Sequence, residues 1–250
     1  MADLVLREDD EGIAVLTLNR PDQLNALSPE VFLELQSHLE SIAAAVETIG
    51  CVILRANGRA FSAGADLKAR WSGKRHPAAD TIDFMEALPQ PVIAQVHGYC
   101  FTGGVELALG ADLIVAADTA TFSDTHGKWG LVAGWGQTQR LPRRIGPMKA
   151  KEMIYTGRRY TAAESQAMGL VAMVFPAAEL EQSTRALARE MLANSWHSLR
   201  GHKLLINQGL DRTYSDALRY AIENNPGVAP DRDARVRAGG FVRRDPPRDG

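Results

Sequence analysis

The sequence predicts an α/β protein whose strands pair mostly in parallel. Before about residue 179, short apolar runs rich in β-branched residues alternate with stretches of helical spacing, in the order strand, strand, helix. Beyond that point the pattern is almost entirely helical. Strands that alternate with helices are typical of parallel pairing, because each crossover returns the chain in the same direction. We therefore expect several strand-strand-helix units followed by a helical C-terminal region.

The N-terminal part begins with a predicted hairpin. Strand-like runs at residues 4–7 and 13–18 flank an acidic turn. Ser28 precedes a proline, which is a strong helix start, and apolar residues at a spacing of three or four extend this helix to Val46. An apolar strand follows at residues 51–54.

The stretch from Pro91 to Leu109 is the most informative one. It begins as a strand, turns through Gly103 and Gly104, and resumes as an apolar helix that carries Glu106 in its first turn. Such a turn leaves N–H groups free to bind negative charge, although an ordinary turn with a glutamate favoured by the helix dipole has the same pattern. The spacing of a phosphate-binding loop is present, but Lys and Ser/Thr are missing after Gly103. A smaller oxyanion than a nucleotide phosphate is therefore expected.

A second turn of small residues lies at residues 60–67. It follows a strand and is expected to precede a helix that starts near Asp66, so it can present a second free N–H group. Ser62 is one glycine short of a nucleophile elbow, because Ala60 stands where that motif has glycine. Ser62 is therefore either a small turn residue or, as an alternative, the nucleophile of a serine hydrolase.

The loop at residues 124–136 is dense in glycine and contains His126, Trp129 and Trp135. Ordering such a loop costs conformational entropy, which favours a functional site or an interface over a plain connector. The two tryptophans, with Trp71 and Phe84, are candidates for lining a substrate pocket, although such aromatics are more often found in cores and interfaces.

The other elements follow from apolar spacing and from capping residues. Thr161 with Glu164 three residues later is a capping box at the start of a helix. Strands are expected at 113–117, 121–122 and 171–175, and helices at 81–88, 137–145, 148–156, 179–194, 198–210 and 215–223. The tail at residues 231–250 is expected to be frayed and solvated, unless it contacts a ligand.

Composition narrows the class of protein. The 250 residues are 45% hydrophobic and 23% charged, and the net charge of -2 gives no reason to expect nucleic acid as a partner. No apolar run is long enough for a membrane span, and no leader pattern is visible at the first residues. Cys51 and Cys100 are expected to be buried and reduced, which fits a cytoplasmic location.

Four segments, in this order and spacing, resemble the crotonase superfamily, the enoyl-CoA hydratase/isomerase group. They are Asn19-Arg20-Pro21 with Asn25-Ala26-Leu27, then residues 61–67, then residues 91–108 with Gly103-Gly104-Val105-Glu106, and then residues 136–142. The likeness extends over nearly the whole chain, down to residues 240–244. Each segment alone is weak, whereas their common order is specific.

The resemblance implies a crotonase-like spiral of ββα units with a helical C-terminal trimerisation region. It divides the chain into an acyl-CoA-binding core at residues 1–195 and a helical region with the tail at residues 196–250. It further implies a homotrimer or a hexamer built as a dimer of trimers, which binds acyl-CoA thioesters. No metal and no cofactor are expected, apart from the coenzyme A that forms part of the substrate.

The resemblance also assigns the site. Two backbone N–H groups, at Ala65 and Gly103, would hold the thioester oxygen and stabilise an enolate. In the family, the tail of a neighbouring subunit can reach the CoA phosphates. The expected substrate-binding residues are Gln23, Leu24, Ala26, Ala63, Asp66, Leu67 and Thr102, with Phe241 and Arg244 in the tail.

The chain departs from the family at one catalytic position. Hydratases of this family use two glutamates around a water molecule. Glu106 matches the first, but His126 stands in place of the second, and the nearest acid in that loop is Asp124. A glutamate and a histidine are expected to form a charged pair, which would raise the pKa of His126. We expect Glu106 to act as base, and protonated His126 as acid or as electrostatic stabiliser of the enolate.

Three functions remain open on this evidence. The first is an acyl-CoA lyase of the enoyl-CoA hydratase type. The second is another crotonase-type reaction, namely double-bond isomerisation, decarboxylation or thioester hydrolysis. The third is a non-catalytic member that binds CoA or a partner protein. A shared fold cannot choose among them.

Overall fold

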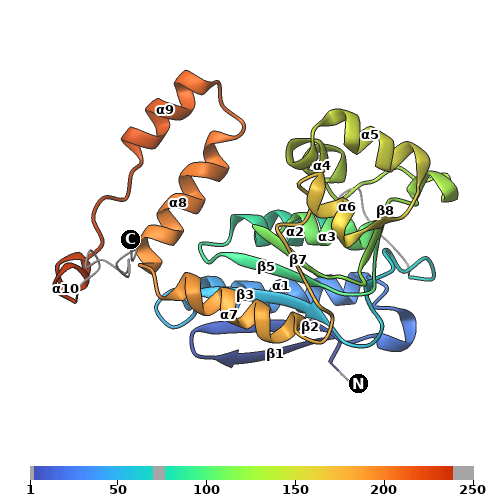
Figure 1. The fold of residues 1–250 in the computed structure, drawn as a ribbon, viewed down its shortest axis with the longest axis horizontal. Helices are drawn as coiled ribbons and strands as arrows, with labels where there is room; N and C mark the ends of the chain where they lie inside the picture. Colours follow the sequence, from blue (N-terminus) through green and yellow to red (C-terminus); the bar gives the residue numbers. More distant parts are fainter. Residues whose placement is uncertain (1–2, 70–76, 239–250) are drawn as a thin grey trace, which may run out of the picture. The chain divides into compact units, whose positions relative to one another are not determined.

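The larger of two sheets has six strands in the order β1-β2-β3-β5-β7-β10, in a computed structural model that describes residues 3–69 and 77–238 (Figure 1). β1 and β2 form the expected antiparallel hairpin, and the remaining neighbours are parallel, as predicted. All six residues of β2 are buried, as is usual for a strand covered on both faces. The strands are β1 (Val5–Asp10), β2 (Ile13–Leu18), β3 (Cys51–Ala56), β5 (Val92–Val96), β7 (Leu113–Ala117) and β10 (Met173–Phe175).

A smaller sheet has the order β4-β6-β8-β9. The first three of these strands are parallel and the last pair is antiparallel. Each strand of the larger sheet from β3 to β7 is followed by a short strand of the smaller sheet, which confirms the predicted strand-strand-helix units. The short strands are β4 (Ala60–Ser62), β6 (Tyr99–Phe101), β8 (Thr121–Ser123) and β9 (Tyr160–Thr161). The sequence pattern did not predict β4 or β6.

Helices cover the larger sheet and connect its strands. α1 and α7 both contact the larger sheet, and α1 also packs against α2. α3 contacts β4 and β6 of the smaller sheet as well as α4. The helices of this part are α1 (Pro29–Ala44), α2 (Pro77–Ala87), α3 (Gly103–Leu109), α4 (Gln137–Ile145), α5 (Pro147–Thr156), α6 (Ala162–Ala167) and α7 (Leu180–Leu192), with 3-10 turns η1 (Pro21–Gln23) and η2 (His126–Trp129).

α1 begins where the sequence predicts it, with a proline at its first position. Its apolar stripe lies in the core through Val31, Leu35 and Leu39. Ser28 occupies the N-cap position, but its hydroxyl donates to Glu30 and makes no capping bond to the backbone. The helix ends at Ala44, two residues before its predicted end.

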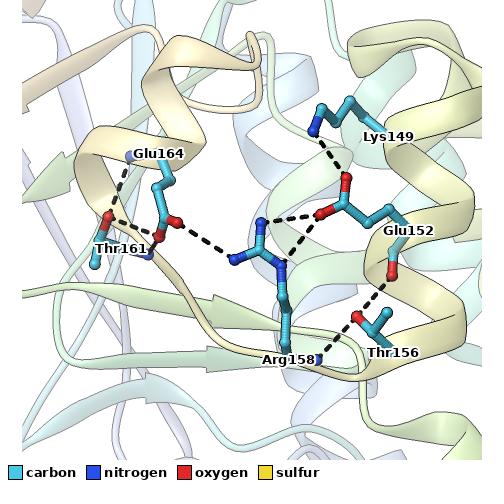
Figure 2. A network of polar contacts seen from close by, with 6 residues as sticks. All are labelled: Lys149, Glu152, Thr156, Arg158, Thr161 and Glu164. Carbon is cyan, nitrogen blue, oxygen red and sulfur yellow. Dashed lines mark hydrogen bonds and ion pairs between the residues drawn. The ribbon is translucent and has the colours of Figure 1, made fainter.

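The capping box at α6 is confirmed and belongs to a surface network (Figure 2). Thr161 Oγ1 accepts from the N–H of Glu164, and the Glu164 carboxylate accepts from the N–H of Thr161. Arg158 joins this cap to α5, because its guanidinium pairs with both Glu152 and Glu164. Lys149 also pairs with Glu152. These groups are exposed, so the ion pairs contribute little to the free energy of folding.

One predicted helix start is wrong. The described residues from Leu67 to Ala69 form turns and a bend, and the next helix within the described residues is α2 at Pro77. The Asp66 carboxylate instead accepts a hydrogen bond from the N–H of Lys68, two residues on, which is a turn geometry and not a helix cap.

The chain divides into two compact units, Met1–Leu192 and Ala193–Gly250. In the second unit, α8 (Trp196–Gly209) and α9 (Tyr214–Glu223) pack on each other. A short helix, α10 (Arg232–Arg237), lies in what was expected to be a frayed tail. Phe241 and Arg244 lie outside the described residues. The expected division between residues 195 and 196, with its functional roles, stays a prediction.

Both cysteines are buried as free thiols, as expected, and burial raises the pKa of the Cys100 thiol. Within residues 3–69 and 77–238, no cluster of three or more potential metal-ligating side chains is present. Across the same residues, every helix is too short or too polar to cross a lipid bilayer.

Candidate active site

The two turns of small residues lie against each other. A Cβ atom placed on Gly103 would be 3.1 Å from the amide nitrogen of Ala65, and one placed on Gly64 would be 3.2 Å from the amide nitrogen of Gly103. Leu27 pairs with this segment, accepting from the N–H of Asp66 at 2.7 Å and donating to Gly64 at 2.9 Å. Among the hydrogen bonds of the described residues, none has Ala65 N–H or Gly103 N–H as its donor. Two neighbouring segments therefore each present a backbone N–H group that has no acceptor among the described residues.

Thr102 holds Gly103 in place through a strained backbone. Its φ of 54° and ψ of -113° lie outside the regions that side chains ordinarily allow. Its N–H donates to the carbonyl of Ser123 at 2.9 Å, and its hydroxyl shares a 2.6 Å hydrogen bond with the hydroxyl of Thr125. Because Thr125 precedes His126, this bond connects the turn of Gly103 to the loop that carries the histidine. Strain of this kind is a mark of functional sites.

Glu106 lies in α3 one turn after Gly103, and it is buried. Its Oε1 atom accepts from the N–H of Trp135 at 2.7 Å and from the N–H of Gln137 at 3.3 Å. Both donors lie at the start of α4, where backbone N–H groups are free of helical partners. Two backbone donors on one oxygen stabilise a carboxylate and leave Oε2 available for chemistry.

His126 faces that second oxygen. Its Nε2 atom lies 3.5 Å from Glu106 Oε2, and its Nδ1 atom lies 3.0 Å from Asp124 Oδ1. Burial alone would lower the pKa of His126, but the hydrogen bonds and charges of Asp124 and Glu106 outweigh it and raise the pKa to about 9. The ring is therefore an imidazolium at neutral pH. The predicted pair of Glu106 and His126 is brought together, with Asp124 as a third member.

Asp124 and Gln137 are the members that the sequence pattern did not assign. Asp124 was noted only as the nearest acid of its loop, and Gln137 only as part of the family likeness. The Gln137 side-chain amide donates to Asp124 Oδ2, and its backbone N–H donates to Glu106. The Asp124-x-His126 spacing was the available signal, because a carboxylate two residues before a histidine can reach its Nδ1 atom.

Apart from Thr102, the expected substrate-binding residues of the first unit lie in two neighbouring loops, at residues 23–26 and 63–67. Leu24 has a left-handed backbone, and its carbonyl accepts from the N–H of Ala63, which joins the loops. Gln23 and Leu67 are exposed, Leu24, Ala26, Ala63 and Asp66 are partly buried, and Thr102 is buried.

Asp66 is already engaged by protein groups. Arg20 pairs with it at 2.9 Å and also donates to the carbonyl of Ala26. Burial raises the pKa of Asp66, but the N–H of Lys68 and the guanidinium of Arg20 outweigh this and lower it. The loop geometry at the site therefore depends on this ion pair.

Ser62 has a structural partner on both sides. Its buried hydroxyl donates to the carbonyl of Asn25 at 2.8 Å and accepts from the N–H of Gly64 at 3.1 Å. These bonds support its interpretation as a turn residue and give no support to a serine nucleophile. Of the aromatic candidates, Trp135 is buried and packs edge-on against Phe32, whereas Trp129 is exposed, and Trp71 lies outside the described residues.

Comparisons with known proteins identify the family to which the chain belongs. Residues 8–235 match the family described as Enoyl-CoA hydratase/isomerase. The chain is 39% identical over 234 residues to a Bacillus subtilis protein named "Putative enoyl-CoA hydratase/isomerase YngF", with 90% of each chain covered. It is 38% identical over 222 residues to "Probable enoyl-CoA hydratase echA8" of Mycobacterium tuberculosis, with 86% of each covered.

A solved structure of an enoyl-CoA hydratase from Bacillus anthracis is similar throughout. Its TM-score is 0.90 at 34% identity, with 96% of this chain and 97% of that chain covered. The chain therefore belongs to the enoyl-CoA hydratase/isomerase, or crotonase, family of enzymes. The predicted crotonase-like α/β fold is confirmed.

Proposed function

We propose that the protein is an acyl-CoA-processing lyase of the enoyl-CoA hydratase type. One observation supports this above the others: a buried Glu106–His126 pair lies beside the free N–H groups of Ala65 and Gly103. The N–H pair suits a thioester oxygen on which negative charge develops, and such a donor is typically worth ~10²–10³ in rate. The carboxylate and the imidazolium supply a base and an acid whose facing atoms are 3.5 Å apart.

Water addition to an enoyl thioester needs no proton donor or acceptor beyond these groups. Glu106 removes a proton from a water molecule whose oxygen adds to the β-carbon of the enoyl thioester. The resulting enolate oxygen is held by Ala65 and Gly103. His126 then transfers its Nε2 proton to the α-carbon, which completes the hydroxyacyl product. The proton on Glu106 returns to the neutral imidazole across the 3.5 Å that separates Oε2 from Nε2.

The alternative is another crotonase-type reaction on the same enolate. His126 in place of a second glutamate favours keeping double-bond isomerisation, decarboxylation and thioester hydrolysis open, because an acid and a base can also move a proton between two carbons. A non-catalytic CoA-binding member remains the third possibility.

A substrate panel distinguishes these reactions. Enoyl-CoA, malonyl-type CoA and β-keto-CoA esters are incubated with the enzyme and followed for water addition, carbon dioxide release, double-bond shift and loss of thioester. We expect water addition to an enoyl-CoA, abolished in Glu106→Gln and unchanged in the surface control Glu152→Gln (Figure 2). Another product would move the enzyme to the alternative class. No turnover with retained CoA-ester binding would favour the non-catalytic member.

We further propose that coenzyme A is bound by the loops that carry the expected substrate-binding residues, helped by the tail of a neighbouring subunit. The support in the first unit is the pairing of the loops through Leu24 and Ala63. Deleting residues 240–250 removes Phe241 and Arg244 and should weaken CoA-ester affinity several-fold. Unchanged affinity would remove the tail from the site.

From the family resemblance we also propose that the protein forms a homotrimer or a hexamer. α8 and α9 expose large apolar side chains within the described residues, among them Ile206, Leu210, Tyr214 and Ile222. Exposed apolar surface of this kind marks a contact with another molecule. Sedimentation at micromolar concentration should give a trimer or a hexamer, and a monomer would contradict the proposal. A cytoplasmic location stays an expectation from the sequence.

A further inference from the structure

Asp124 accepts three hydrogen bonds and has almost no exposed surface. Its Oδ1 atom accepts from the backbone N–H of His126 at 2.8 Å and faces Nδ1 of the same residue at 3.0 Å. Its Oδ2 atom accepts from the side-chain amide of Gln137. A group that is surrounded only by donors is an ionised carboxylate, since a protonated one would bring a hydrogen against one of them.

Gln137 donates its side-chain amide to Asp124, while its own side-chain carbonyl has no partner within the described part of the chain. The residue is fully buried, and so is this carbonyl oxygen, Oε1. Rotating the amide would turn Oε1 toward the Asp124 carboxylate, where two acceptors repel, so the observed orientation is the favourable one. A buried acceptor without a partner destabilises a fold; an apolar side chain of similar volume would avoid that penalty at Oε1 but would leave Asp124 Oδ2 without its donor. This amide is therefore better explained by its donation to Asp124 than by stability.

The charge around His126 comes from few groups. α3 contributes Glu106, and the segment before η2 contributes Asp124. α4 contributes the neutral amide of Gln137. α5 packs against η2, and its Lys149 and Glu152 pair in the surface network with Arg158 (Figure 2), while Lys151 of α5 and Lys128 of η2 are exposed.

The two ring nitrogens of His126 have different partners and therefore different roles. Nδ1–H is held by Asp124, a permanent acceptor, whereas Nε2–H faces Glu106 over a longer distance of 3.5 Å. The proton that can leave is therefore the one on Nε2. Once it has left, the neutral ring keeps Nδ1–H toward Asp124 and presents the Nε2 lone pair for reprotonation.

We propose that Asp124, oriented by Gln137, is a positioning residue that fixes the tautomer of His126 and directs its Nε2 proton to the substrate. The inference rests on the proposed role of His126 as acid. In this arrangement the imidazole lies between two carboxylates, with Asp124 at Nδ1 and Glu106 at Nε2. Asp124 touches no reacting atom in this arrangement.

Asp124→Asn tests the proposal, because it removes the charge and keeps the shape. We expect kcat to fall ~10-fold or more with KM within ~3-fold, since the substrate does not contact Asp124. We also expect the basic limb of the kcat–pH profile to move to lower pH by one unit or more. The ¹³C-histidine NMR titration, with His126 assigned from its loss in His126→Gln, should show the same shift. Asp118→Asn is the control, because Asp118 is exposed and accepts its backbone N–H from Ala177, a residue outside the site.

Gln137→Met provides a second route, because it removes the amide donor to Asp124 Oδ2, together with the unpartnered Oε1 atom, at similar side-chain volume. Because Asp124 then lacks the donor that orients it, we expect kcat to fall and the His126 titration to differ from that of the parent. An unchanged pH profile and an unchanged His126 titration in both variants would overturn the positioning role. If His126→Gln and Glu106→Gln also keep full activity, the proposed function itself fails. If only those two are inactive, the failure is confined to Asp124 and Gln137.

Discussion

Gly103 lies so close to Trp135 that a methyl group on its α-carbon would overlap the six-membered ring of the indole. The same methyl group would also come within 3.1 Å of the amide nitrogen of Ala65. The backbone N–H of Trp135 meanwhile donates to Glu106. One tryptophan therefore borders the proposed oxyanion donors with its ring and orients the proposed base with its backbone, and only glycine fits at position 103.

Gly103→Ala should lower kcat/KM by ~10²–10³, the typical loss for a displaced oxyanion donor. The added methyl group must push away either the indole ring or the turn of Ala65. Gly134→Ala is the matched control, because its methyl group would meet nothing within 4 Å. Activity on the substrate found in the panel is measured, with unfolding temperature and sedimentation as checks of folding.

A double variant separates overlap from other damage. In a Trp135→Ala background the methyl group of Gly103→Ala has room, so its effect on kcat/KM should shrink, and the two changes should be non-additive. Gly103→Pro deletes the N–H itself and should abolish turnover. Proline also restricts the preceding Thr102, so that variant is informative only while folded and oligomeric. Full activity of folded Gly103→Ala or Gly103→Pro would contradict the donor assignment.

Arg140 connects α2 to α4 and supports the same loop. Its guanidinium donates to the carbonyl of Trp135 at 2.9 Å and pairs with Glu86 at 2.7 Å and Asp83 at 2.6 Å. Burial opposes its charge, but the two carboxylates outweigh this and raise the pKa of Arg140. Lysine cannot reproduce this fork of donors. Arg140→Lys should lower the free energy of unfolding by ~1–3 kcal/mol and reduce kcat.

The control for Arg140 is Arg143→Lys, an exposed position on the same helix whose guanidinium bonds to Gln139. Urea denaturation and kcat are measured for both. If Arg140→Lys loses stability but keeps kcat, the guanidinium supports the fold without orienting the loop of Trp135.

From the sequence, Glu106 and His126 could be predicted to lie together, because chemistry limits the choice of residues at such positions. Glycines at 103 and 104 followed by Glu106, and a histidine in a loop dense in glycine, need particular residue types for backbone exposure and proton transfer. The large apolar strands were equally visible, because burial on both faces demands continuous apolar runs.

The parts that were missed depend on contacts between distant segments. β4 and β6 are only three residues long, and their pairing joins segments about forty residues apart, which no local pattern reveals. Asp66 resembled a helix start, but its partners are Lys68 and Arg20, the latter 46 positions away. Gln137 looks like any polar residue at the start of a helix until the fold sets its amide against Asp124.

Asp66→Asn should destabilise the loops at neutral pH by ~1 kcal/mol, the scale of a partly exposed ion pair. Because the pKa of Asp66 is lowered in the folded state, its contribution is present above the ordinary aspartate range and is lost as pH falls through the lowered pKa. The unfolding curves of parent and variant should therefore converge in acid. Asp9→Asn, at the more exposed pair with Arg7, should show a smaller difference at neutral pH. Curves that stay parallel down to the acid range would contradict the role of the Asp66 charge.

His126→Gln should lower kcat by ~10²-fold with little change in CoA-ester affinity, because it removes the acid and keeps a polar side chain at this position. In the parent enzyme the active form is the imidazolium. With a pKa raised to about 9, kcat should be flat from pH 6 to 8 and fall about tenfold per unit above pH 9. If His126 instead had its ordinary pKa of 6.5, kcat would already fall between pH 6 and 8.

The same shift makes a prediction for stability. Because the folded-state pKa of His126 exceeds the unfolded value, its stabilisation is complete below about pH 6.5 and disappears as pH rises through about 9. The unfolding temperature of the parent should therefore fall across this window more steeply than that of His126→Gln, whose side chain does not titrate. Parallel unfolding profiles together with near-full activity of the variant would mean that the histidine is structural, and Asp124 or a bound water would become the better candidate for the acid.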